Sequence, residues 1–195
     1  MKTVHMRRAS AFCYGLCFAL GITGAGCVGD GALDESEAST SSAITLDVNA
    51  SYTIVGVQSN KCVGVVDSSL ASLARLEIRT CGGIASQRFR PEAMGGGFFR
   101  LRNELSGLCM DVSGGSLADG AAVIQFACGT QLNQQWSFTD LASGAERLTA
   151  RHSGKVLDVT GQATADGTLV EQWTWNTGTN QQYRLATALA ASPIQ

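Results

Sequence analysis

The sequence has no long stretch in which apolar residues recur at helical spacing, so a helix-rich fold is not expected. It shows no basic patch interleaved with aromatic residues, which argues against nucleic acid as a partner. It also lacks close cysteine pairs with nearby histidines, so we predict neither a zinc site nor any other cofactor. Its 23 glycines lie among short apolar runs, a composition typical of many short strands joined by turns.

One pattern occurs three times at a fixed interval of 47 residues, with no gap. Each copy ends in an aromatic residue that follows a glutamine by two positions, and these aromatic residues are expected in the core: Phe89, Trp136 and Tyr183. Such a period indicates one supersecondary unit built three times. Four short strands per unit give about twelve strands, and closing them into an all-β arrangement with pseudo-threefold symmetry would remove exposed sheet edges. The predicted strands are 51–55, 62–66, 76–79, 87–89, 98–102, 109–112, 123–127, 135–138, 146–150, 156–159, 170–175 and 182–185.

Residues 1–27 have the layout of a secretory signal peptide, with a basic start, an apolar run too short to span a bilayer well, and small residues before Cys27. This end resembles a bacterial lipobox, in which Cys27 becomes a lipidated N-terminus, although Gly24 stands where leucine is usual. The alternative is ordinary cleavage nearby, which leaves Cys27 a free thiol. We expect an exported protein, either secreted or a lipoprotein of the outer membrane or cell surface.

Two short segments flank the repeats. Residues 28–45 contain four acids and no bases, and they are predicted to form a flexible linker. The repeats occupy 46–186, and the tail 187–195 receives no role. Without the three basic residues of the leader, the chain has 11 basic and 16 acidic residues, which gives a net charge of −5.

Four cysteines outside the leader form an even set at a repeated spacing. In an exported chain this set implies disulfide bonds, most simply Cys62–Cys81 and Cys109–Cys128. The third copy has Val156 and Trp175 at these positions, so packing is expected to replace the bridge there.

The Q-x-W elements at 87–89, 134–136 and 181–183 resemble the signature of ricin B-type β-trefoil lectins. The segment 108–112 (LCMDV) and the ADG at 118–120 resemble the same family, and the third copy repeats both at 155–159 and 165–167. The resemblance covers essentially all of 46–186, and it implies a β-trefoil that binds carbohydrate through one shallow pocket per repeat.

In this family an aspartate accepts hydrogen bonds from sugar hydroxyls, an aromatic ring stacks on the sugar, and an Asn-Gln pair completes the polar ring. The resemblance places Asp158, Glu171, Trp173, Asn180 and Gln181 in the third pocket. For the second pocket the corresponding set is Asp111, Phe126, Asn133 and Gln134, with Ile124 where a polar residue is common. The first copy has Gly64, Arg79 and Ser86 at these positions, so we expect its pocket not to bind sugar.

Simpler roles remain open for several of these residues. Asp111 and Asp158 could serve turns, although Asp119 and Asp166, each before a glycine, are better turn candidates. Gln134 and Gln181 could equally bind backbone groups, and Trp173 could be packed in the core.

Catalysis is not expected. A glycosidase needs two carboxylates about 5–9.5 Å apart, whereas Asp111 and Asp158 belong to different repeats. His152 is expected to be a surface residue beside a Ser-Gly turn. We therefore predict a monomeric, non-enzymatic lectin module for galactose- or xylose-type sugars or polysaccharides, attached to a membrane only through a lipid on Cys27. Two alternatives remain: a trefoil that acts by protein contact, such as a secreted protease inhibitor, or a module that accompanies a separate glycan-degrading enzyme.

Overall fold

The computed structural model describes residues 46–187, and this part of the chain forms twelve strands and six short 3₁₀ helices. The strands of the first repeat are β1 (Tyr52–Gly56), β2 (Cys62–Val65), β3 (Leu76–Arg79) and β4 (Phe89–Gly95). Those of the second are β5 (Phe98–Asn103), β6 (Cys109–Val112), β7 (Ala121–Phe126) and β8 (Gln135–Asp140). Those of the third are β9 (Glu146–Ala150), β10 (Val156–Val159), β11 (Thr168–Trp173) and β12 (Tyr183–Thr187).

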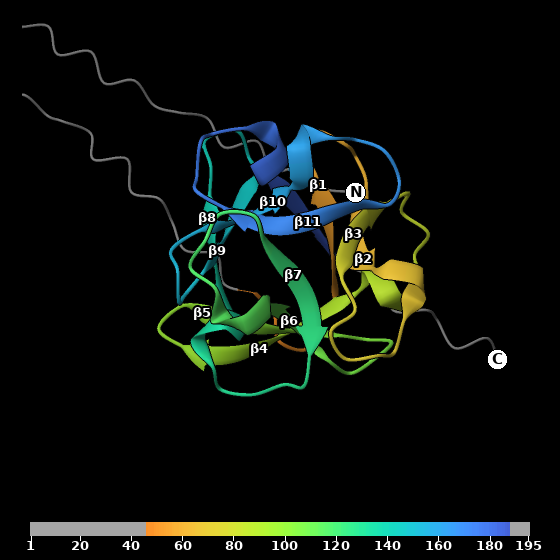
Figure 1. The fold of residues 1–195 in the computed structure, drawn as a ribbon, viewed down its shortest axis with the longest axis vertical. Helices are drawn as coiled ribbons and strands as arrows, with labels where there is room; N and C mark the ends of the chain where they lie inside the picture. Colours follow the sequence, from red (N-terminus) through yellow and green to blue (C-terminus); the bar gives the residue numbers. More distant parts are fainter. Residues whose placement is uncertain (1–45, 188–195) are drawn as a thin grey trace, which may run out of the picture. The chain divides into compact units, whose positions relative to one another are not determined.

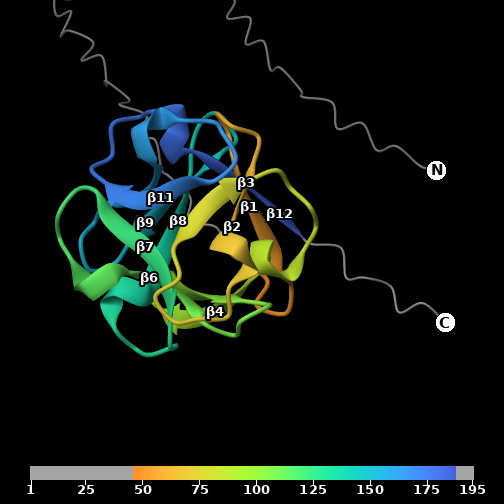
Figure 2. The same cartoon turned by 45° about the vertical axis from the view of Figure 1, so that its right-hand side comes forward.

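Six strands close into an antiparallel barrel in the order β1-β4-β5-β8-β9-β12, and β12 pairs again with β1 (Figure 1). The other six strands form the hairpins β2–β3, β6–β7 and β10–β11. These hairpins converge, because β11 pairs with both β3 and β7 (Figure 2). The predicted closed all-β fold with threefold symmetry is thereby confirmed.

Residues at the 47-residue spacing fill the core. Phe89, Trp136 and Tyr183 are almost completely buried, as predicted. Two further sets of equivalent residues are buried in the same way: Ile54, Leu101 and Leu148, and Val65, Val112 and Val159. Each repeat therefore contributes the same layers to one shared core, which a single repeat could not close.

The strand boundaries match the predicted ranges closely, with one regular difference before each closing strand. The glutamines of the Q-x-W elements end short 3₁₀ helices, η2 (Ala85–Gln87), η4 (Leu132–Gln134) and η6 (Thr179–Gln181). The strand that follows η2, β4, extends to Gly95, well beyond the predicted end at residue 89, because it pairs with β5 over most of its length.

Both predicted disulfide bonds are present, with Cα–Cα distances of 5.0 Å for Cys62–Cys81 and 5.1 Å for Cys109–Cys128. In the third repeat the Trp175 ring packs under the guanidinium of Arg147, 5.1 Å from the ring centroid. This cation–π contact anchors the segment that a disulfide holds in the other two copies.

Asp119 and Asp166 lie in turns, as expected, but each also binds the next repeat. Asp119 accepts a hydrogen bond from the backbone N–H of Thr174 at 2.7 Å and pairs with Lys155 at 2.6 Å. Asp166 does the same with Thr80 and Lys61, at 2.8 Å and 2.6 Å. These acidic turns therefore fasten neighbouring hairpins to each other.

Candidate functional site

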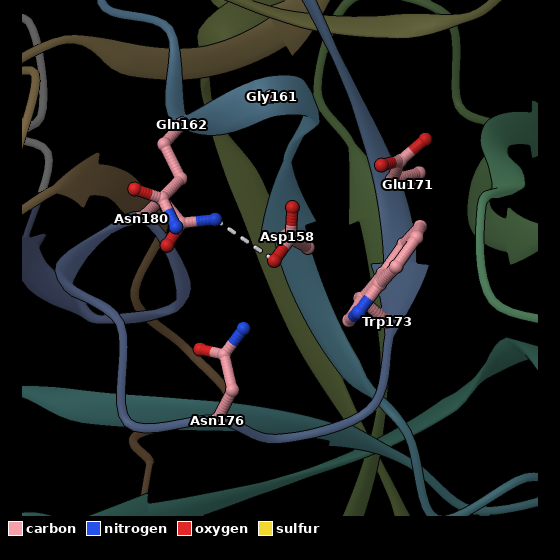
Figure 3. A pocket seen from close by; sticks show the side chains of 7 residues that line it. All are labelled: Asp158, Gly161, Gln162, Glu171, Trp173, Asn176 and Asn180. Carbon is pink, nitrogen blue, oxygen red and sulfur yellow. Dashed lines mark hydrogen bonds between the residues drawn. The ribbon is translucent and has the colours of Figure 1, made fainter.

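The third repeat contains a cavity of about 220 Å³ between the β10–β11 hairpin and the loop before β12. Figure 3 shows Asp158 at its base and Trp173 beside it. The lining residues are Asp158, Gly161, Gln162, Glu171, Trp173, Asn176 and Asn180. The structure thus brings together four of the five residues that the resemblance placed in the third pocket, and only Gln181 is missing from the lining.

The carboxylate of Asp158 is held on one side only. Its Oδ2 accepts hydrogen bonds from Asn180 Nδ2 at 2.9 Å and from Gln181 Nε2 at 2.7 Å. No side chain or backbone group of the described residues donates to Oδ1, and Figure 3 shows the second oxygen pointing away from Asn180. Asp158 is therefore fixed in orientation and keeps one acceptor oxygen for a ligand.

Burial raises the pKa of Asp158 from its ordinary value of 3.8 to about 6. The negative charge of Glu171 adds to this rise, because Glu171 lies directly opposite Asp158 in the β10–β11 pairing. The hydrogen bonds from Gln181 and Asn180 oppose the rise without cancelling it. Two carboxylates thus face one small cavity, and no basic residue lines it.

Trp173 ends β11 with its side chain 40% exposed, so it is not a core residue. A Cβ atom on Gly120 would lie only 3.7 Å from the Trp173 ring. The Asp119–Gly120 turn of the second repeat therefore approaches the third cavity at Trp173. An exposed indole beside polar acceptors is the arrangement that binds the apolar face of a sugar ring.

Gln134 and Gln181 are buried, and each joins the site aspartate to the backbone. Gln181 donates to both Asp158 and the Thr174 carbonyl and accepts from the Asn176 N–H. Gln134 makes the matching bonds to Asp111, Ala127 and Gly129. Since both side chains are about 1% exposed or less, they contact the aspartates from the protein interior.

The second repeat brings its predicted residues together in a poorer version of the same site. Asn133 donates to Asp111 Oδ1 at 3.0 Å and Gln134 donates to Oδ2 at 2.8 Å, so both carboxylate oxygens have protein partners. Burial raises the pKa of Asp111 as well. Phe126 is 42% exposed, and Ile124 is buried at the position of Glu171.

The first repeat differs at three of the ligand positions, with Gly64, Arg79 and Ser86, and keeps Glu77 and Gln87 at the positions of Glu171 and Gln181. The Arg79 guanidinium pairs with Glu77 at 2.7 Å, and the hydroxyls of Ser68 and Ser86 are 2.9 Å apart. A Cβ atom on Gly64 would lie 2.8 Å from Gln87 Cγ, so an aspartate would not fit there without a shift. The cavity at the equivalent place is therefore small, about 50 Å³.

Three lining residues of the third cavity were not predicted: Gly161, Gln162 and Asn176. The second repeat has Gly115 and Gly129 where the third has Gln162 and Asn176. This departure from the repeat was the available signal, because the first copy also has small residues at these positions, Ser68 and Gly82.

One other expectation needs correction. His152 is half-buried, and its Nε2 lies 2.9 Å from the Ser116 carbonyl oxygen, so it joins two repeats instead of lying free on the surface. On the β4–β5 hairpin, Arg90 and Arg102 are direct cross-strand partners. Their aromatic neighbours Phe89 and Phe99 are buried in the core.

Within residues 46–187, no three His, Cys, Asp or Glu side chains gather as metal ligands. No helix in that part of the chain is long and apolar enough to cross a membrane. The disulfide bonds suggest an extracellular protein. The predicted leader with Cys27, the whole linker and all of the tail except Thr187 lie outside the described residues.

Comparisons with known proteins agree with this geometry. A search of curated protein sequences gave no match. Among solved structures, ThreeFoil, a designed threefold-symmetric protein, is 38% identical with a TM-score of 0.69; the match covers 71% of this chain and 98% of that one. The exo-β-1,3-galactanase 1,3Gal43A of Clostridium thermocellum is 35% identical with a TM-score of 0.69, over 71% of this chain but only 30% of the enzyme.

A ricin B-like lectin of Macrolepiota procera, solved in complex with lactose, shares the fold at 19% identity and a TM-score of 0.63, covering 73% of this chain and 98% of the lectin. The model of the ricin-type β-trefoil lectin domain matches residues 50–186. That match spans all twelve strands except the last residue of β12. The chain therefore belongs to the family of ricin-type β-trefoil lectin domains.

Proposed function

We propose that this protein binds carbohydrate, and that its main binding site is the third-repeat cavity. The observation that carries the proposal is the state of Asp158: Oδ2 is held by Asn180 and Gln181, while Oδ1 has no protein donor among the described residues. The exposed face of Trp173 lies beside it. A fixed acceptor next to an aromatic face suits a pyranose, which has hydroxyls at its edge and an apolar C–H face.

The roles of the lining residues follow from their positions. Asp158 and Glu171 would accept hydrogen bonds from sugar hydroxyls, and Trp173 would stack on the ring. Gln181 would act as a positioning residue, since it is buried and touches the site through Asp158. Asn176 and Gln162 add amide groups that can donate as well as accept.

The second repeat would form a weaker site. Asp111 has protein partners on both oxygens, so a sugar hydroxyl must share an acceptor there. Ile124 replaces the second carboxylate, and Gly129 replaces the amide of Asn176. Two unequal sites on one rigid frame would still gain avidity toward a polysaccharide. The first repeat would serve the fold.

Galactose- and xylose-type sugars are the ligand classes to test first. The galactanase that shares 35% identity with this chain acts, by its name, on β-1,3-galactan. Lactose, which contains galactose, is bound in the structure of the more distant Macrolepiota lectin. These relatives favour galactose-containing glycans over xylans as the first set.

The test is a glycan array probed with the parent protein, an Asp158→Asn variant and an Asp111→Asn variant. Asparagine at 158 can still accept from Asn180 and Gln181 but turns the free oxygen into a donor, so the fold is kept while the acceptor is lost. We expect Asp158→Asn to weaken binding by about tenfold or more, and Asp111→Asn to have a smaller effect.

Circular dichroism confirms in parallel that both variants are folded. Equal binding by the parent and Asp158→Asn would remove the third cavity from the proposal. A folded parent that binds no glycan would shift the interpretation to protein contact.

A further inference from the structure

A second cavity, of about 320 Å³, lies on the barrel where β4 and β5 meet the loops before and after them. Its lining is Ala85, Arg88, Arg90, Arg102, Asn103, Glu104 and Gly107. Three guanidinium groups and one carboxylate thus face a space within the range of about 300–1,000 Å³ that is typical of small-molecule sites. The local charge is positive, although the chain as a whole is acidic.

Two of the arginines face each other across the β4–β5 pairing, and of the two Arg102 also pairs with Glu92. Arg90 on β4 is the direct cross-strand partner of Arg102 on β5. Like charges placed directly opposite each other in an antiparallel pair destabilise a sheet. The equivalent pairs elsewhere in the barrel are Ser137 with Thr149 and Val55 with Arg184, so the fold does not require two arginines here.

Several donors in this cavity have no acceptor in the described part of the protein. Arg102 donates to Glu92 at 2.5 Å and to the Gly107 carbonyl at 2.7 Å through Nε and Nη1, which leaves Nη2. Arg88 similarly uses Nε on Glu104 and Nη1 on the Gly83 carbonyl. Arg90 is exposed, and its side chain makes no hydrogen bond or ion pair with any residue in 46–187.

We propose that this cavity is a separate ligand site for an acidic sugar unit, one that carries a carboxylate or a sulfate ester. An oxyanion between Arg90 and Arg102 would relieve their repulsion and accept the free donors. The remaining lining favours a sugar over a bare anion, because Glu104 repels a free oxyanion, and its two oxygens, which accept from Ser51 and Arg88, keep further lone pairs for hydroxyls. No aromatic side chain lines the cavity, so it lacks the stacking platform of single-stranded nucleic acid sites.

The experiment is an NMR titration of the ¹⁵N-labelled full chain with galacturonate and, separately, with galactose. Backbone amides of β4 and β5 and the Nε–H groups of the arginines report on the site. We expect galacturonate to shift these signals with a Kd at least about tenfold below that of galactose at the same place. Galactose 6-sulfate, inorganic sulfate and a thymidine oligonucleotide complete the set of probes.

A matched pair of variants separates this site from general electrostatics. Arg184 is exposed on β12 at the position equivalent to Arg90, two repeats later. Arg90→Gln and Arg184→Gln therefore remove the same charge from equivalent strands. We expect Arg90→Gln to raise the Kd for galacturonate about tenfold and Arg184→Gln to leave it unchanged.

Four results would overturn the proposal: equal weakening by the two variants, equal affinity for galactose and galacturonate, binding of inorganic sulfate as tight as that of the sugar acid, or tighter binding of the oligonucleotide. The proposal does not depend on sugar binding in the third repeat. A failure of this proposal can be distinguished from a failure of the proposed function. The second cavity is followed through NMR signals of β4 and β5, whereas the third-repeat cavity is followed through signals of β10 and β11.

Discussion

Replacing Asp158 with asparagine should weaken sugar binding in the third repeat and, at neutral pH, make the protein more stable. Asp158 is buried opposite Glu171, and its pKa rises from 3.8 to about 6, first because of burial. The folded protein therefore holds a charged carboxylate at pH 7 in a place that favours the uncharged form. A neutral asparagine of the same shape avoids this cost.

The sign and the size follow from linkage between protonation and folding. A carboxyl with a higher pKa in the folded state than in the unfolded state binds protons more tightly when folded, so stability falls as pH rises from 3.8 to 6. The difference between the two values corresponds to at most about 3 kcal/mol at pH 7. For a domain of this size that amounts to a rise in Tm of up to roughly 10 °C in the variant.

The assay is thermal and urea unfolding of the parent and Asp158→Asn between pH 4 and pH 8. The variant should be more stable than the parent at pH 7, and the difference should shrink toward pH 4. Sugar affinity of the parent should change in the opposite direction, weakening as pH falls below 6, because the acceptor becomes protonated.

Asp119→Asn is the control. Its carboxylate is exposed, and the Lys155 ammonium lowers its pKa, so this change should not stabilise the protein at pH 7. A parent and an Asp158→Asn variant with the same stability at pH 7 would refute the reasoning. So would a stability difference that stays constant across the pH range.

Two further predictions concern packing, and urea unfolding tests both. Gly64→Ala should destabilise the protein by about 1–3 kcal/mol, because its Cβ would approach Gln87 Cγ at 2.8 Å. In the control Gly82→Ala no atom would be closer to the Cβ than 3.7 Å, so this variant should lose less than half as much stability. Gln172→Leu should cost about 2–3 kcal/mol in the same assay, since the buried amide of Gln172 donates to the carbonyls of Ser116 and Ala118 and these would lose their partner. A cost below about 0.5 kcal/mol for Gly64→Ala or Gln172→Leu would contradict that prediction.

The fold could be read from the sequence because its determinants repeat. Phe89, Trp136 and Tyr183 mark the same core position three times, and coincidence at a fixed spacing is far more informative than one aromatic residue. The cysteine spacing likewise gave both disulfide pairs. The short 3₁₀ helices were missed because three-residue turns leave no periodic pattern of apolar residues.

The candidate site could be read only in part. Asp158 and Trp173 follow from the resemblance to ricin-type lectins, but the depth of Gln181 does not, since its direction depends on the geometry of η6. Gln162 and Asn176 also line the cavity, and only their departure from the glycines of the second repeat marked them in the sequence. The pairing of Arg90 with Arg102 depends on the register of β4 and β5, which residue spacing alone does not fix.

The first repeat separates the structural part of each pocket from its ligand-binding part. Gln87 has no aspartate to bind, because Gly64 stands in its place, yet it keeps the two backbone bonds of its counterparts: it donates to the Thr80 carbonyl at 3.0 Å and accepts from the Gly82 N–H at 2.8 Å. The glutamine is therefore retained by the fold whether or not an aspartate is present. In the other two repeats, by contrast, Asp111 and Asp158 are buried, and the burial disfavours the charged carboxylate and raises its pKa. Since burial of such a charge opposes folding, this contrast supports the proposal that Asp111 and Asp158 serve a ligand.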